Sequence, residues 1–336
     1  MSRRRDPVQQ RDDGSLDLQN VVEWEPRSLV DRGIYQLYGL LAIAARGLLV
    51  IGALFILLAQ FALGGLGALA DPVVGVFVVL SAVPAMVLAG YIWYADVTPS
   101  EPFRLLVVTF GLGLLFAGFA GVLNTLLAPR LATVLVGFNA SRSVILATIF
   151  LFVVAPVEES VKLLAVRLYA YRQPQFDAVV VGAVYGGVAG LGFATIENAV
   201  YITGVVDGVG TTVLDGSSIA TLRALAGPGH VIYSAFAGYY LGLARFNRRY
   251  AGPIVLKGLL VASLIHGVYN VLVSHVPAYV TDVFGYSQFG AFFTFVIIYN
   301  GFFVLLLVFK LSEYRSVYEQ THEETQITSE RTEFDP

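Results

Sequence analysis

The sequence predicts an all-α protein that crosses a membrane about eight times. Hydrophobic residues make up 57% of the 336 residues and charged residues only 13%, whereas a soluble domain carries roughly 25% charge. The mean hydropathy is +0.73. The apolar residues gather in stretches of roughly 20, which is the length that a helix needs to cross the hydrocarbon core. These observations indicate a polytopic membrane protein.

Two kinds of feature are not expected in this chain. The polar, basic N-terminus MSRRRDPVQQRDDG has no short apolar segment directly behind it, so we expect no cleavable signal peptide. The chain has no cysteine, which excludes disulfides, thiolate metal sites and cysteine nucleophiles.

Residues 34–45 are expected to form an interfacial helix, or to extend the first span with Arg46 at the headgroups.

Eight stretches are expected to span the membrane. The first three and the eighth should form a scaffold, with a kink at Pro84. In the fifth, Gly182, Gly186 and Gly190 recur every four residues, which lets a neighbouring helix approach closely. The spans run from Gly47 to Leu69, Val73 to Tyr94, Leu105 to Leu127, Ser143 to Ala170, Ala178 to Thr203, Leu222 to Ala244, Pro253 to His275 and Phe289 to Leu311.

Basic residues in the connections predict the orientation. They concentrate in the N-terminal arm, in the fourth-to-fifth and sixth-to-seventh connections and after the last span, and the opposite side has only Arg130, Arg142 and Arg223. The positive-inside rule then places both termini in the cytoplasm of a cell-membrane protein. We expect a polar arm (1–46), three scaffold spans (47–142), a four-helix catalytic core (143–275), a last span (276–311) and an acidic tail (312–336).

Two adjacent glutamates in the fourth span give the main functional signal. A charge at the bilayer centre costs on the order of 3 kcal/mol on insertion scales, so such residues usually mark function. Lys162 follows Glu159 by three residues and Glu158 by four, and can meet both on one helix face. It could neutralise one glutamate and leave the other as a proton acceptor.

Further polar residues lie in the next three spans. The fifth holds Glu197, the sixth His230, and the seventh His266 with Asn270 one turn further on. Turning these groups toward one another is the least costly way to keep them in lipid. We therefore expect one polar site, and the helical rise places it in the outer half of the membrane.

The same four segments resemble, in order, the motifs of the PrsW family of intramembrane proteases. EESVK fits EExxK, GFATIENAVY fits FxxxEN through Phe193, Glu197 and Asn198, GPGHVIYSAFAGYYLG resembles the third motif, and LIHGVYN fits HxxxN. The resemblance covers roughly residues 150–275. The related CAAX prenyl endopeptidases have EExxxR and FxxxH instead, so Lys162 and Glu197 favour PrsW.

The resemblance implies hydrolysis of a peptide bond in a membrane-anchored protein, such as an anti-sigma factor. It implies the lipid bilayer and a protein substrate as partners, and no nucleic acid. Three alternatives stay open: a proton- or ion-coupled transporter built on the same Glu and His residues, a CAAX-type endopeptidase, and an inactive scaffold. The clustering of the polar residues in one block, with no counterpart elsewhere in the chain, argues against the transporter.

The expected mechanism uses Glu159 as general base and Glu158 as the partner held by Lys162. His230 and His266 then have two possible tasks. They could bind Zn²⁺ with Glu159 as third ligand, or position the water and stabilise the oxyanion together with Asn270. The sequence does not distinguish a metal-dependent from a metal-free mechanism, because the zinc-binding motif HExxH is absent. Glu197 completes the expected catalytic group.

Overall fold

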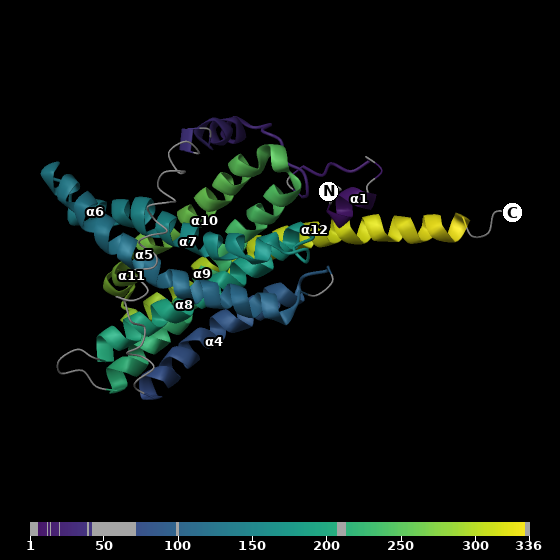
Figure 1. Ribbon diagram of the computed structural model, residues 1–336. Helices are drawn as coiled ribbons and strands as arrows, with labels where there is room; N and C mark the ends of the chain where they lie inside the picture. The colour runs from purple at the N-terminus through teal and green to yellow at the C-terminus, as the bar shows by residue number, and fades with distance from the viewer. Residues whose placement is uncertain are drawn as a thin grey trace.

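A computed structural model describes residues 6–41 apart from 12, 14, 20 and 39, together with residues 72–98, 101–206 and 213–332. This part of the chain is helical and contains no β-strand, as predicted (Figure 1). Its α-helices include α1 (Pro7–Arg11), α4 (Pro72–Tyr94), α5 (Phe103–Gly137), α6 (Arg142–Ile149), α7 (Ala155–Leu168), α8 (Val179–Val206), α9 (Val213–Phe246), α10 (Ala251–Val273), α11 (Val276–Phe284) and α12 (Gln288–Thr332).

Six helical segments among the described residues are long and apolar enough to cross a membrane. They are α4, α5, α6 with α7, α8, α10 with α11, and α12. The expected sixth span falls in α9, which has 34 residues but a more polar sequence. The expected first span, from Gly47 to Leu69, lies outside the described residues. The chain is thus an all-α membrane protein.

Helices α8 and α9 form the centre of the bundle, because glycines allow their backbones to touch. A Cβ atom at Gly186 would lie 2.2 Å from the carbonyl oxygen of Ser234, and one at Gly190 would lie 2.3 Å from that of His230. Any larger residue would push the helices apart. The glycine pattern therefore fixes the distance between the polar residues of α8 and those of α9, as the sequence predicts.

A π-helical segment (η1, Phe150–Val154) joins α6 to α7 directly before the two glutamates. Pro156 lies in the first turn of α7 and has no N–H to donate to the preceding turn. The π-turn lies where this helical hydrogen bond is missing. Such turns often occur at functional sites. The sequence predicts a helix that is continuous apart from Pro156, whereas the structure has a π-turn before this proline, which rotates the helix that follows relative to a regular α-helix.

The N-terminal arm packs against the end of the bundle where the described C-terminal part of α12 also lies (Figure 1). Asp6 is fully buried, accepts a hydrogen bond from the backbone N–H of Val179 at 3.1 Å and accepts another from the hydroxyl of Tyr314. Trp24 is buried, and its backbone N–H donates to the side-chain oxygen of Asn247. Both ends of the chain therefore share one end of the bundle, and the side of the membrane that this end faces stays a prediction.

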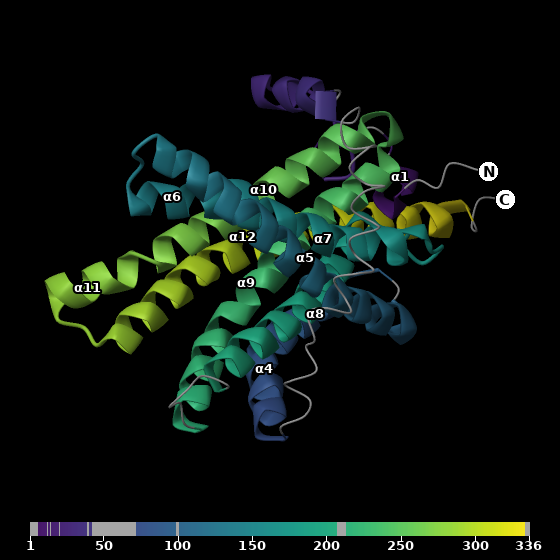
Figure 2. The same cartoon turned by 60° about the vertical axis from the view of Figure 1, so that its left-hand side comes forward.

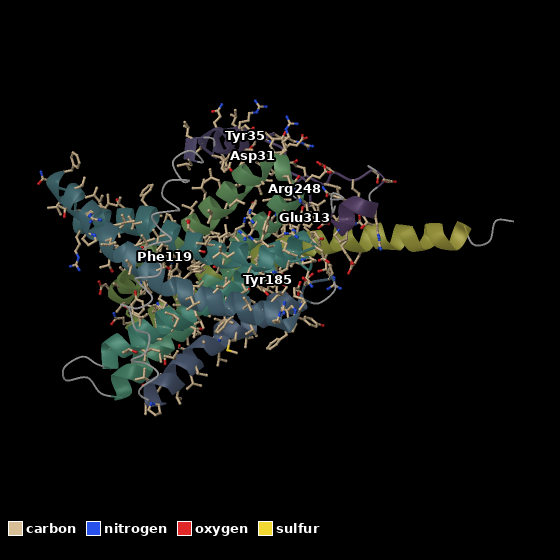
Figure 3. The ribbon with its side chains drawn as sticks, viewed as in Figure 1. Asp31, Tyr35, Phe119, Tyr185, Arg248 and Glu313 are labelled. Carbon is tan, nitrogen blue, oxygen red and sulfur yellow. The ribbon has the colours of Figure 1, made fainter. Side chains whose placement is uncertain are left out.

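Residues 29–38 of the arm are helical and lie over α10 (Figure 3). Asp31 binds Lys257 of α10 at 2.8 Å, and Tyr35 contacts Tyr250 edge to face. Leu29 and Val30 remain 86% and 67% exposed. The helix overlaps the segment expected to be interfacial (34–45) only in part, and there Leu37 is 43% exposed, which suits an interfacial position.

Candidate active site

Four helices bring the predicted polar residues into one buried cluster. Glu158, Glu159 and Lys162 come from α7 and are at most 5% exposed. Glu197 comes from α8, His230 from α9 and His266 from α10. The charged and imidazole groups of these helices contact one another inside the bundle, and the helices shield them from lipid.

Glu159 is the most completely bound carboxylate of the cluster. Its Oε1 accepts from Lys162 Nζ at 2.6 Å and lies 2.8 Å from His266 Nδ1. Its Oε2 accepts from the Ser234 hydroxyl at 3.3 Å. A carboxylate with this many partners holds its neighbours in place, and here it fixes the orientation of the His266 ring.

Lys162 pairs differently from the sequence-based expectation. It was expected to hold Glu158, but its Nζ lies 4.0 Å from Glu158 Oε2 and only 2.6 Å from Glu159. The cause is the packing of the neighbouring helices, because Lys162 Nζ also lies 2.9 Å from His230 Nδ1 and over the ring of Phe193. These contacts draw the ammonium toward α8 and α9, and Glu159 is the glutamate on that side.

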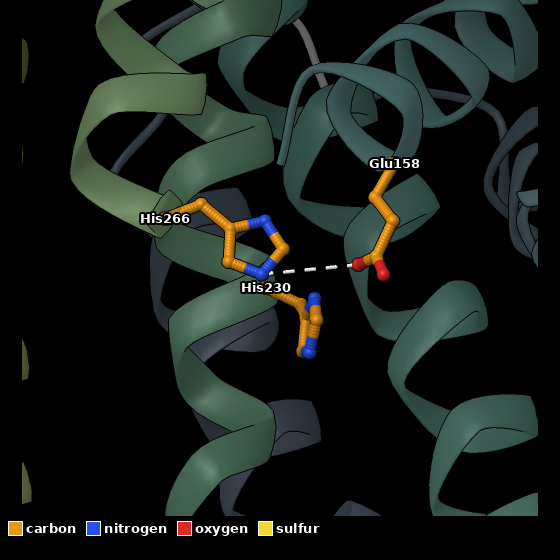
Figure 4. Close-up of side chains that lie close together, drawn as sticks. All are labelled: Glu158, His230 and His266. Carbon is orange, nitrogen blue, oxygen red and sulfur yellow. Dashed lines mark ion pairs between the residues drawn. The ribbon is translucent and has the colours of Figure 1, made fainter. Parts of the chain in front are cut away.

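Glu158 keeps one oxygen without a hydrogen-bond partner. Its Oε1 accepts from the side chain of Asn124 at 3.2 Å, whereas its buried Oε2 has no hydrogen bond. This Oε2 lies 3.8 Å from His266 Nε2 (Figure 4). The separation is too long for a direct hydrogen bond and leaves both atoms available to a third group. Asn124 also shows that the third span, expected to be scaffold only, reaches the site.

His230 has partners at both ring nitrogens. Lys162 contacts Nδ1, and Glu197 Oε2 lies 2.7 Å from Nε2. Glu197 in turn binds Arg223 at 2.5 Å, and Arg223 Nε donates to Asn198 Oδ1 at 2.8 Å. A continuous polar chain therefore runs from Arg223 through Glu197 and His230 to Lys162.

Arg223 and Tyr233 are parts of the site that sequence reasoning did not identify. Arg223 was counted among the connection charges, yet it lies seven residues before His230 and so on the same face of α9. Tyr233 follows His230 by three residues, and its ring stacks on His266 at 5.0 Å. Its hydroxyl is buried without a partner. The helical spacing from His230 was the signal that could have found both.

Asn270 stays apart from this network in the described structure. It lies one turn beyond His266 and is half-buried, and its backbone carbonyl accepts from Ser274. No described residue forms a hydrogen bond with its side-chain amide. Within the described part of the chain, no contact of Asn270 with the cluster supports the expected role in oxyanion stabilisation.

The cluster also has the donors that a metal ion would need. Glu158, His230 and His266 each offer a ligand atom, and these atoms lie within 4.8 Å of one another. The unpartnered Glu158 Oε2 and the His266 Nε2, whose ring is fixed through Nδ1, suit a zinc-type ion. This donor set contains Glu158 in place of the expected Glu159. His230 could join it only by releasing Lys162 or Glu197.

Charge balance inside the cluster leaves one carboxylate that can accept a proton or bind a cation. With both imidazoles neutral, the carboxylates of Glu158, Glu159 and Glu197 face the two cations of Lys162 and Arg223. One negative charge is left over at a depth where unpaired charge is costly. This excess negative charge lies on Glu158, because Glu158 is the carboxylate with an oxygen that has no hydrogen-bond partner.

The known proteins that resemble this chain are proteases of one family. The sequence profile of a family described as "PrsW family intramembrane metalloprotease" matches residues 101–305, more than half of the chain. A Protease PrsW from Oceanobacillus iheyensis is 27% identical over 242 residues, covering 71% of this chain and 94% of the relative. One from Bacillus subtilis is 30% identical over 59% of this chain and 84% of the relative. No solved structure matches.

Proposed function

Because this chain belongs to the PrsW family of intramembrane metalloproteases, we propose that it cleaves a membrane-anchored protein at the cluster of Glu158, His230 and His266. The substrate class that the sequence motifs imply is an anti-sigma factor or a protein like it. We further propose a location in the cell membrane with both termini in the cytoplasm. Family membership places the chain among proteases rather than transporters.

One observation carries the assignment of residues: the free Glu158 Oε2 opposite His266 Nε2 at 3.8 Å. A water molecule between these atoms could donate one hydrogen bond to the carboxylate and be positioned by the imidazole. Glu158 is thus the better general base, and Glu159 is occupied by Lys162, His266 and Ser234. This assignment exchanges the roles that the sequence suggested for the two glutamates.

In the proposed reaction Glu158 takes a proton from the water as its oxygen attacks the scissile carbonyl carbon. The carbonyl oxygen becomes an oxyanion and needs hydrogen-bond donors. The buried hydroxyl of Tyr233, which has no partner beside His266, is one such donor. When the C–N bond breaks, Glu158 returns the proton to the leaving amine. The oxygen of the water then belongs to the new carboxyl group, and its proton to the new amine.

A divalent ion such as Zn²⁺ would be held by the same three side chains, Glu158, His230 and His266. When bound, it would lower the pKa of a coordinated water and polarise the scissile carbonyl. In either version Glu159 orients His266, and the pair of Lys162 and Glu197 orients His230. These positioning roles do not depend on the presence of the ion.

Co-expression with a tagged single-span substrate tests the proposal. Glu158→Gln and His266→Ala should each abolish cleavage while the protein remains in the membrane. The matched control is Glu101→Gln, the same change at a glutamate that is 4% exposed and lies outside the cluster; it should cleave normally. Cleavage that survives Glu158→Gln would refute the role of Glu158.

A further inference from the structure

A groove opens at the end of the bundle opposite the chain termini. Its volume is about 640 Å³, and it is lined by the first turns of α9, by the α10–α11 junction and by the start of α12. Figure 2 shows that the connected ends of α8 and α9 diverge from α11 and α12 on this side. The groove is of the size that proteins use to bind ligands.

The groove is close to the catalytic cluster along two helices. On α10, its lining residue Val273 follows His266 by seven residues, which is about 10 Å at 1.5 Å per residue. On α9, Leu222 directly precedes Arg223, which binds Glu197. A polypeptide that leaves the catalytic residues along α9 and α10 would therefore enter the groove.

The chemistry of the lining suits an uncharged, extended peptide. Leu222, Phe289 and Phe292 offer apolar surface. Thr221 and Ser274 donate their hydroxyl protons to carbonyls of their own helices, so their oxygens remain as hydrogen-bond acceptors. None of the lining residues is charged, so a charged substrate residue would lose hydration there without gaining a partner. Apolar substrate side chains would instead bury their surface against the two phenylalanines.

We propose that this groove is the substrate subsite of the protease and that it selects uncharged, apolar residues about three to five positions from the scissile bond. An extended chain advances 3.3–3.6 Å per residue, so about three residues cover the roughly 10 Å between His266 and Val273. The lining continues past Val273 to Pro277 and Ala278, which leaves room for about two further residues. This inference rests on the proposed function and adds the determinant of specificity.

The absence of native cysteine makes a crosslinking test direct in the full chain. Ser274→Cys and Thr221→Cys are placed in the inactive Glu158→Gln background, and single cysteines are moved along the substrate on both sides of its cleavage site. A short bismaleimide should join either groove cysteine to substrate positions three to five residues from that site. Ser312→Cys, an exposed serine of α12 that lies 24 residues beyond the lining residue Gln288 and does not line the groove, should give no such crosslink.

A kinetic test complements the crosslinks. Ser274→Trp fills the groove and should lower kcat/KM about tenfold, mainly through KM, while Ser312→Trp, on an exposed position outside the groove, should leave it unchanged. A charged residue placed at the crosslinked substrate position should slow cleavage to a similar extent.

The outcomes separate the two proposals. Wild-type protein that cleaves the substrate, combined with groove cysteines that crosslink nowhere or at every position alike, overturns the subsite and leaves the protease assignment intact. Failure of the wild type to cleave any membrane-anchored candidate overturns the proposed function and the subsite with it.

Discussion

Removing the ammonium group of Lys162 should destabilise the protein strongly, because this group neutralises buried carboxylates. Lys162 is 1% exposed, donates to Glu159 at 2.6 Å and contacts His230 at 2.9 Å. Lys162→Met keeps most of the side-chain volume but leaves Glu159 charged without its closest cation. Breaking one partner of a buried ion pair costs about 3–5 kcal/mol.

Thermal unfolding in detergent measures this effect. At about 2–4 °C per kcal/mol for a chain of several hundred residues, the unfolding midpoint should fall by roughly 10 °C. Arg315→Met is the matched control, because Arg315 and Glu319 form an exposed pair with side chains 58% and 52% accessible. This control should leave the midpoint within the error of the measurement, since exposed pairs contribute little.

A double variant tests the physical cause. Lys162→Met combined with Glu159→Gln removes both charges, so it should recover at least half of the lost stability, but it should not recover cleavage because His266 loses its anionic partner. If Lys162→Met melts like the exposed control, or if the double variant is no more stable than the single one, the buried-pair reasoning is wrong.

Three further predictions concern pH, metal and packing. Burial and the neighbouring Asp96 raise the pKa of Glu101, which lies between α4 and α5, to about 9 from a usual 4.5, so folding takes up a proton between these values and stability should fall as pH rises through them. Glu101→Gln should therefore match wild type in unfolding midpoint near pH 5 and exceed it near pH 8; an identical pH profile in both would contradict this. Purified protein should hold a divalent metal ion that His266→Ala loses, as measured by elemental analysis, and full activity of metal-free protein would contradict a role for the ion. Gly186→Ala should lower the free energy of unfolding by about 1–3 kcal/mol and reduce cleavage, since its Cβ would lie 2.2 Å from Ser234 O. Gly204→Ala should do neither, because a Cβ there would meet no neighbouring side chain or helix within 4 Å.

Much of the fold and the composition of the site could be predicted without coordinates. A helix is the structure that satisfies its own backbone hydrogen bonds in lipid, so the long apolar stretches predict helices directly. The polar residues in four consecutive spans predict their own convergence, because Glu158 or His266 facing lipid alone would be too costly. The glycine repeat of the fifth span likewise predicts the close contact that α8 makes with α9.

The details of the site could not be predicted in the same way. The choice between Glu158 and Glu159 depends on the rotation of α7, and the π-turn before Pro156 sets that rotation. Asn124 is separated from Glu158 by 34 positions in the sequence, and only the packing of α5 against α7 brings them together. Arg223 was taken for a connection charge because the sequence gives no depth for the start of α9.

The sequence by itself determined the class of the protein, its family and the set of ionisable groups that its helices must shield from lipid, because these follow from composition, local periodicity and motif order. The tertiary structure decided which carboxylate oxygen stays free, which cation neutralises which acid, and where a peptide could lie beside the site. Those features depend on helix rotation and on contacts between distant residues. They are fixed only when the whole bundle is packed.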